Sequence, residues 1–179
     1  PLAARFLPPE LRSIYSQVVD GGRIDESQAL KLMRHGDLNA IGTIANVVRE
    51  RINGNVATYI RNLYVNYSNI CVLSCQFCAF GARKRDAHAF EFSHDDIVAK
   101  VRVGLQGGIT EVHMVGGLHP TLTSEWYVQL IQKLRELDGN LFIKAFTAIE
   151  IRHLAERIFK KSIQETLQIL KDAGLGALT

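Results

Sequence analysis

From residue 56 onward, the sequence alternates between short runs that favour β-strands and longer runs with helical periodicity. The strand-like runs cover residues 59–67, 111–115 and 141–146, and another begins at 175–179. The helical runs begin near Ser93, Ser124, Ile149 and Ser162. Ser93 and Ser162 each precede an acidic residue by three positions, which is the spacing of a capping box at the start of a helix. This alternation predicts an α/β fold with a parallel sheet, either open or curled into a (β/α) barrel.

Residues 1–55 have a different pattern and are expected to form a separate N-terminal helical segment. Gly21-Gly22 interrupts the first helical run, and Asp37 has the character of an N-cap for a second, stronger one. Residues 56–179 would then be the first part of the barrel. A strand that begins at residue 175 would leave an open sheet edge, which folded proteins usually cover. We therefore expect a truncated chain, the first part of a longer barrel.

The composition excludes several classes of function. The chain has 179 residues, of which 47% are hydrophobic and 22% charged, as in ordinary globular proteins. A formal net charge of +3 is too small to indicate nucleic-acid binding, and the basic run Arg83-Lys84-Arg85 is typical of a solvated loop. No apolar run is long enough to cross a bilayer, and the N-terminus lacks the pattern of a signal peptide. We therefore expect a cytoplasmic protein.

All three cysteines fall on one short segment, as Cys71-x3-Cys75-x2-Cys78. Clustered thiols normally mark a metal site, and an odd number of them argues against a disulfide framework. A structural zinc site needs four ligands, and the candidate for a fourth, His88, lies at an unusual interval. Bacterial ferredoxins use a fourth cysteine, which this chain lacks. Three thiolates can instead ligate three irons of a cubane cluster and leave the fourth iron open to a substrate.

The cysteine loop is one of three segments that directly follow a predicted strand. The other two are Gly116-Gly117 and Thr147–Glu150. Because the carboxyl ends of parallel strands meet at one edge, we expect all three segments to gather on the same face. Glycines without a Cβ allow the backbone to approach a ligand closely, although a tight turn is the plainer explanation of such a pair.

The cysteine spacing, with the aromatic Phe77 directly before the last cysteine, resembles the signature of the radical S-adenosylmethionine superfamily. This resemblance implies a [4Fe–4S] cluster on the three cysteines, whose open iron binds the amino and carboxylate groups of S-adenosylmethionine. It also implies that Phe77, Gly116 and Gly117 bind the cofactor, and that the reduced cluster cleaves S-adenosylmethionine to a 5′-deoxyadenosyl radical. The partners would be a small-molecule substrate and an electron donor such as flavodoxin or ferredoxin. Leu118 replaces the acidic residue that commonly follows the two glycines.

Three further stretches, at residues 66–71, 111–120 and 144–150, are similar to the futalosine-pathway and deazaflavin-cofactor branches of this superfamily. The run Lys-Ala-Phe-Thr-Ala-Ile-Glu at 144–150 is most similar to the aminofutalosine synthase family of menaquinone biosynthesis. That resemblance implies addition of the radical to the enol ether of 3-[(1-carboxyvinyl)oxy]benzoate, giving 6-amino-6-deoxyfutalosine and bicarbonate. The alternatives are a sister radical enzyme (dehypoxanthine futalosine cyclase or deazaflavin cofactor synthase) and a non-catalytic iron–sulfur or zinc protein.

Three titratable residues near the expected strand ends are candidate catalytic groups. His113 and His119 flank the glycine pair, and an imidazole there can orient a substrate carboxylate or supply a proton. Glu150 follows the third strand and is expected to reach the cofactor or substrate. The plainer interpretations are hydrogen-bonded structural histidines and an acidic residue at a helix N-terminus.

Overall fold

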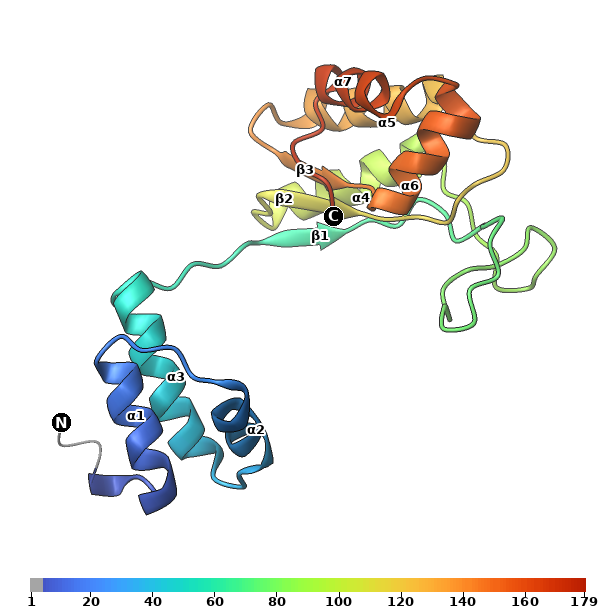
Figure 1. Ribbon diagram of the computed structural model, residues 1–179. Helices are drawn as coiled ribbons and strands as arrows, with labels where there is room; N and C mark the ends of the chain where they lie inside the picture. Colours follow the sequence, from blue (N-terminus) through green and yellow to red (C-terminus); the bar gives the residue numbers. More distant parts are fainter. Residues whose placement is uncertain (1–4) are drawn as a thin grey trace. The chain divides into compact units, whose positions relative to one another are not determined.

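The computed structural model describes residues 5–179, and the chain divides into two units, one ending at Tyr59 and one running from Ile60 to Thr179 (Figure 1). The sequence prediction placed this boundary between residues 55 and 56. Among the described residues, no helix combines the length and the apolar character needed to cross a membrane.

The first unit is helical. It contains the 3-10 turn η2 (Pro9–Leu11) and the helices α1 (Arg12–Val19), α2 (Glu26–Arg34) and α3 (Leu38–Asn53). The predicted N-cap of the last helix is confirmed, because the Asp37 carboxylate accepts a hydrogen bond of 3.0 Å from the Ala40 amide. The buried side chains that hold these helices together come from η2, α1, α3 and the segment before them, namely Leu7, Leu11, Ile14, Tyr15, Val18, Ala40 and Ile44.

The second unit is an α/β layer built on a three-stranded parallel sheet in the order β1-β2-β3. Its elements in chain order are β1 (Asn62–Tyr64), α4 (His94–Gln106), β2 (Glu111–Met114), α5 (Ser124–Leu137), β3 (Phe142–Ala145), α6 (Ala148–His153), the π-helix η3 (Leu154–Phe159) and α7 (Ile163–Ala173). The α/β prediction with a parallel sheet is therefore confirmed. Near the C-terminus, Ala177 pairs in parallel with Lys144 of β3, as a single bridge and not as the strand expected over 175–179.

The side chains of each strand alternate between two faces of the sheet, as strand geometry requires. Val112 and Met114 of β2 are fully buried in a core shared with α4, α5 and α7, and Ile143 and Ala145 of β3 lie in the same core. The intervening residues therefore project from the opposite face. Figure 1 shows α5 and α7 packed on one side of the strands.

The helix starts agree with the predicted capping boxes at Ser93 and Ser162, which both form with their reciprocal hydrogen bonds. The prediction of Ser124 as a cap is wrong by one residue. Thr123 has the extended backbone of an N-cap and accepts a hydrogen bond of 3.3 Å from the Trp126 amide, so Ser124 is already helical.

The first strand is shorter than the predicted run of residues 59–67. After Tyr64, the amide of Val65 still donates to the His113 carbonyl at 3.0 Å. The chain then leaves β2 and pairs with another segment, since the Phe92 amide donates to the Tyr67 carbonyl at 2.9 Å. The prediction of β-prone residues in this run is confirmed. The sequence could not show that the first part of the run pairs with β2 and the last part with the segment at Phe92.

Candidate functional site

The cysteine loop is closed at its base by hydrogen bonds that involve Asn69, whose side chain is buried. Its amide group donates to the His88 carbonyl at 2.9 Å and its side-chain oxygen accepts from the Phe90 amide at 2.7 Å. Two backbone bonds of 2.9 Å, Cys71 to the Ala82 carbonyl and Ala82 to the Asn69 carbonyl, close the loop further. These contacts hold both ends of the cysteine loop independently of any ligand.

Within the loop, backbone amides point at two of the three free thiols. The Cys71 sulfur accepts from the Leu73 amide at 3.4 Å and from the Leu118 amide at 3.3 Å. The Cys78 sulfur accepts from the Gly81 amide at 3.3 Å. These hydrogen bonds orient the two sulfur atoms within the loop.

The residues of the cysteine loop differ in their exposure to solvent. Cys71 is half-buried, whereas Cys75, Cys78 and the ring of Phe77 are exposed. Among the described residues, no three His, Cys, Asp or Glu side chains converge in an arrangement that could hold a metal ion. The structure therefore places the three thiols on one loop without gathering them at one point.

The two glycines after β2 are required by packing against the cysteine loop and the strand that leads into it. A Cβ on Gly116 would lie 2.2 Å from the ring of Tyr67, and one on Gly117 would lie 2.2 Å from the Ile70 carbonyl oxygen. Their amides are also occupied, since Gly116 donates to Glu150 at 2.8 Å and Gly117 to the Ser68 carbonyl at 2.9 Å. The close approach expected at a ligand is made here to the protein itself. Only the carbonyl oxygens, which accept no hydrogen bond among the described residues, remain for a ligand.

Glu150 is buried and fully hydrogen-bonded. One carboxylate oxygen accepts from the Tyr67 hydroxyl at 3.1 Å and from the Gly116 amide at 2.8 Å. The other accepts from the Thr147 amide at 2.7 Å and the Thr147 hydroxyl at 2.9 Å. Four donors fill the four acceptor positions of a carboxylate. Glu150 thus ties together three segments that follow the three strands, and has no acceptor position left for a substrate.

Tyr67 is the donor that remains protonated in this cluster. Burial raises the pKa of Tyr67 well above its usual value, and the charge of Glu150 raises it further. The ring is also packed edge-on against Tyr127 and Phe146, with centroid distances of 5.8 and 6.4 Å. The hydroxyl therefore acts as a fixed donor to Glu150.

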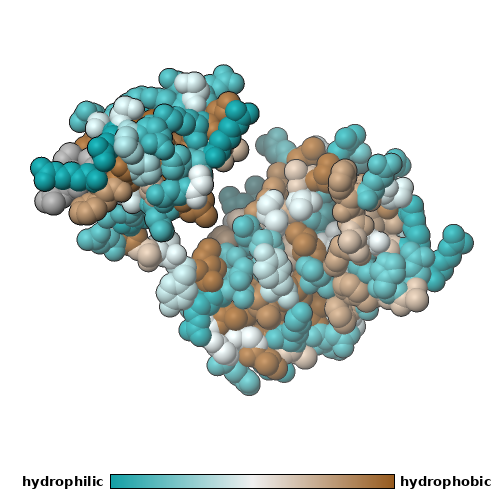
Figure 2. Space-filling view, turned by 90° about the horizontal axis from the view of Figure 1, so that it is seen from below, coloured by the Kyte–Doolittle hydropathy of each residue, from teal (hydrophilic) through white to brown (hydrophobic). Residues whose placement is uncertain are grey.

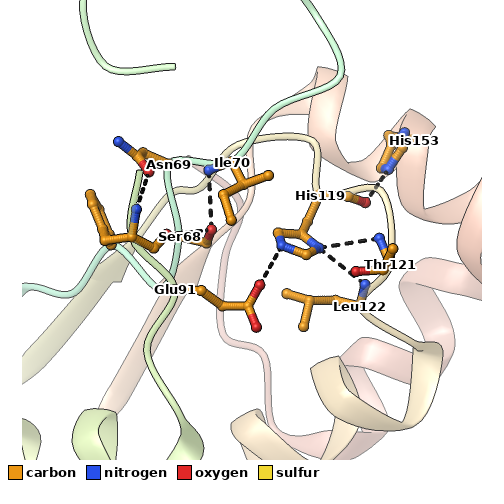
Figure 3. A network of polar contacts seen from close by, with 9 residues as sticks. Ser68, Asn69, Ile70, Glu91, His119, Thr121, Leu122 and His153 are labelled. Atoms are coloured by element: carbon orange, nitrogen blue, oxygen red, sulfur yellow. Dashed lines mark hydrogen bonds and ion pairs between the residues drawn. The ribbon is translucent and has the colours of Figure 1, made fainter. Parts of the chain in front are cut away.

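His119 lies at the centre of a second buried network, shown in Figure 3, and its side chain is 0% exposed. Its Nδ1 accepts from the amides of Thr121 and Leu122 at 3.2 and 3.1 Å, so the ring proton belongs on Nε2. Nε2 lies 2.6 Å from a carboxylate oxygen of Glu91. The backbone carbonyl of His119 in turn accepts from the His153 ring at 3.1 Å. In this arrangement the two amide hydrogen bonds to Nδ1 fix the loop after β2, and Nε2 lies in close polar contact with Glu91.

This network reaches the cysteine loop through Leu118, the neighbour of His119. The Leu118 amide donates to the Cys71 sulfur, and its carbonyl accepts from the Val72 amide at 3.0 Å. His113, by contrast, lies outside both buried networks, on β2 beside Tyr64. The structure thus brings His119, Glu150 and the glycines close to the base of the cysteine loop, and places His113 on the sheet itself.

Two positions that matter here were not recognised in the sequence. Glu91 has no motif around it. Its role follows from its contact with His119, and its segment is held by an antiparallel bridge with Ser68. Arg83 was interpreted as part of a solvated basic run, but its guanidinium donates to the carbonyls of Cys71 and Val72 at 3.1 and 2.9 Å. The only signal in the sequence for this contact is a basic residue shortly after the cysteine motif. Such residues are common in loops, so the signal is weak.

The fold and the site define a β/α half-barrel with a cysteine loop after its first strand. Comparison with known proteins agrees: residues 65–179 match the Radical SAM superfamily. The chain therefore belongs to the radical SAM superfamily, whose enzymes use a [4Fe–4S] cluster and S-adenosylmethionine.

Among curated relatives, the chain is 35% identical over 170 residues to aminodeoxyfutalosine synthase of Thermus thermophilus, covering 95% of this chain and 45% of that protein. It is also 35% identical over 176 residues to the 5-amino-6-(D-ribitylamino)uracil–L-tyrosine 4-hydroxyphenyl transferase of Methanoculleus marisnigri, covering 97% of this chain and 48% of that one. The crystal structure of methylornithine synthase is similar in fold, with a TM-score of 0.56 at 15% identity over 91% of this chain and 57% of that one. The chain spans about half the length of the curated relatives it matches.

The three thiols of the cysteine loop have the chemistry that a cluster of this kind requires, although the described side chains do not converge on one point. Thiolates are the usual ligands of iron–sulfur clusters, and hydrogen bonds to the sulfurs are one of the ways in which proteins tune them. The amides of Leu73, Leu118 and Gly81 supply such bonds at Cys71 and Cys78. When bound, the cluster would supply the electron that cleaves S-adenosylmethionine.

The His119 network leads to a prediction about pH. Burial lowers the pKa of His119 below its usual value of 6.5, and Glu91 only partly offsets this. Between that lowered pKa and 6.5, the unfolded chain binds a proton that the folded chain does not. The free energy of unfolding should therefore fall as the pH drops below 6.5, by at most about 1.4 kcal/mol per pH unit from this group. Urea unfolding at pH 7.5, 6.5 and 5.5 measures this change in the free energy of unfolding.

The matched variants for this experiment are His119→Gln and His88→Gln, the latter at an exposed loop position. We expect His119→Gln to be less stable at pH 7.5 but to lose less stability on acidification than the wild type. His88→Gln should follow the wild-type curve. Equal slopes for His119→Gln and the wild type would show that His119 is not held neutral by the fold.

Proposed function

We propose that this chain carries the cluster-binding and S-adenosylmethionine-binding half of an aminofutalosine synthase. The observation that carries the proposal is the 35% identity to the aminodeoxyfutalosine synthase of Thermus thermophilus over 95% of this chain. The run at residues 144–150, on which the sequence prediction rested, lies within the aligned region and forms the end of β3 and the start of α6. It therefore belongs to the edge of the sheet where radical SAM chemistry would take place.

In the proposed reaction, the 5′-deoxyadenosyl group of S-adenosylmethionine is added to the enol-ether double bond of 3-[(1-carboxyvinyl)oxy]benzoate. Rearrangement, uptake of one water molecule and loss of the carboxyl group as bicarbonate then give 6-amino-6-deoxyfutalosine, and methionine and a proton are released. S-adenosylmethionine is consumed as a substrate. An external electron donor such as flavodoxin or ferredoxin would reduce the cluster, and the exposed side of the cysteine loop around Phe77 is open to such a partner.

The chain's own residues have distinct tasks in this proposal. Cys71, Cys75 and Cys78 would hold the cluster, which would leave one iron for S-adenosylmethionine. Gly116 and Gly117 offer their carbonyl oxygens to its amino group, since their amides are already engaged. His119 and Glu150 act as positioning residues, because both are buried and have their polar atoms in contact with protein partners.

A second candidate is favoured by the equally high identity to the 4-hydroxyphenyl transferase of Methanoculleus marisnigri. Product analysis separates the two after anaerobic reconstitution with iron and sulfide. With S-adenosylmethionine, a reductant and the enol ether, we expect an adenosylated product and methionine in equal amounts. With L-tyrosine and 5-amino-6-(D-ribitylamino)uracil we expect no coupled product. The opposite pattern, or 5′-deoxyadenosine alone with the enol ether, would overturn the proposal.

A further inference from the structure

A row of three side chains crosses the sheet on the face that the helices leave uncovered. The register pairs Tyr64 with His113 and His113 with Lys144, one residue before the end of each of β2 and β3. The helix-facing residues in these strands alternate with them, as the burial of Val112 and Ile143 shows. Tyr64 is 57% exposed, and His113 and Lys144 are half-buried. Figure 2, seen from below, shows hydrophobic and hydrophilic side chains interspersed on the larger unit.

The aromatic part of this row is held in a defined orientation. The rings of Tyr64 and His113 are stacked, with centroids 4.7 Å apart and an angle of 22° between their planes. On the other side, the hydroxyl of Thr179 lies 3.3 Å from His113 Nε2. The stacked pair therefore presents an aromatic surface next to Lys144.

Lys144 is the charged member of the row, and none of the residues that the structure describes forms an ion pair with it. Within residues 5–179, no carboxylate lies within 4.0 Å of its ammonium group. Glu111, the acidic residue that shares this face, is paired in register with Phe142 and not with Lys144. A half-buried ammonium without a neighbouring carboxylate can form a charge-assisted hydrogen bond with an anionic ligand.

We propose that Lys144, with the stacked Tyr64–His113 pair, binds the carboxylate of an aromatic carboxylate substrate, the ring of which lies against Tyr64. This inference rests on the proposed function, because 3-[(1-carboxyvinyl)oxy]benzoate has this chemistry. Lys144 supplies a charge-assisted hydrogen bond, and the aromatic pair supplies a flat apolar surface. The row lies near the carboxyl ends of the strands, the edge of the sheet at which the cysteine loop follows the first strand, so a bound substrate would extend toward the cofactor.

The test is equilibrium binding of 3-[(1-carboxyvinyl)oxy]benzoate to the chain by isothermal titration calorimetry, without cluster or S-adenosylmethionine. We expect Lys144→Met to weaken binding by roughly 10- to 100-fold, the effect of losing a hydrogen bond to a charged group. Lys144→Arg should restore most of the affinity. Lys100→Met, at an exposed position of α4, is the matched control and should bind like the wild type. Circular dichroism confirms that each variant is folded.

Two further ligands separate this inference from the proposed function. The corresponding amide of the ring carboxylate should bind the wild type and Lys144→Met equally. Benzoate should bind weakly and depend on Lys144. If benzoate binding depends on Lys144 but the reconstituted enzyme makes no adenosylated product from the enol ether, the carboxylate site stands and the proposed reaction fails. Equal binding of the enol ether to Lys144→Met and wild type, or no binding of either carboxylate, overturns the inference.

Discussion

Replacing Cys71, Cys75 or Cys78 by alanine is expected to abolish cluster assembly and reductive cleavage of S-adenosylmethionine. The chain has no other thiol to take over the lost ligand. The Cys71 and Cys78 variants would in addition each lose a sulfur that accepts hydrogen bonds from backbone amides. Iron and sulfide analysis after anaerobic reconstitution, together with electron paramagnetic resonance before and after addition of S-adenosylmethionine, measures the effect.

The matched control is Ser74→Ala, which changes an exposed residue of the same loop and keeps all three thiols. This variant should assemble the cluster and show the same spectral change as the wild type. A cysteine variant that retained full iron content and responded to S-adenosylmethionine would contradict the assignment of that cysteine. Absence of any spectral change in the wild type would instead favour a cluster or zinc site with all positions filled by protein.

Glu150→Ala is expected to destabilise the protein by about 3–5 kcal/mol, because it leaves the Tyr67 hydroxyl and the Gly116 and Thr147 amides without their acceptor. The Tyr67 hydroxyl is buried and the two amides belong to half-buried residues, so each unsatisfied donor is costly. A loss of this size is a large part of the total stability of an ordinary domain. Urea unfolding monitored by circular dichroism should show it as a lower transition midpoint with an unchanged slope.

The control is Glu156→Ala on η3, where the glutamate forms an exposed ion pair of 2.9 Å with Arg152. Exposed pairs of this kind contribute about 0.2–1 kcal/mol, so this variant should stay close to the wild type. A Glu150 variant as stable as the Glu156 variant would show that other acceptors replace the carboxylate. In that case the acceptor positions of Glu150 would be free for a catalytic role.

The sequence predicted the elements of this fold that depend on local patterns. The capping boxes at Ser93 and Ser162 and the N-cap at Asp37 are confirmed, because caps are made by residues a few positions apart. The parallel sheet followed from the strand–helix alternation. The length of β1 was wrong because its β-prone residues also pair with the segment at Phe90–Phe92, and such distant pairing leaves no local signal.

The candidate site was predictable in its residues but not in what each residue contacts. The cysteine motif located the loop, and the strand ends located the glycines. The glycines, however, contact Tyr67 and Ile70, and Glu150 contacts Gly116 across 34 positions of sequence. The sequence around His119 did not indicate that Glu91 would lie beside it. Contacts of this kind join residues that are far apart in the chain and depend on the topology of the sheet. A single sequence does not indicate which distant residues meet.

The closed base of the cysteine loop has a consequence for the thermodynamics of cluster assembly. Bringing the ends of a flexible loop together has an entropic cost that grows with the logarithm of its length. Here the hydrogen bonds among Asn69, Ala82 and Phe90 close the base of the loop in the folded chain without a metal, so loop closure is part of the free energy of folding. The free energy of cluster binding then has to order only the tip of the loop, residues 72–81. The apoprotein is in this sense partly preorganised, and its affinity for the cluster should respond to mutations at Asn69 that touch no ligand.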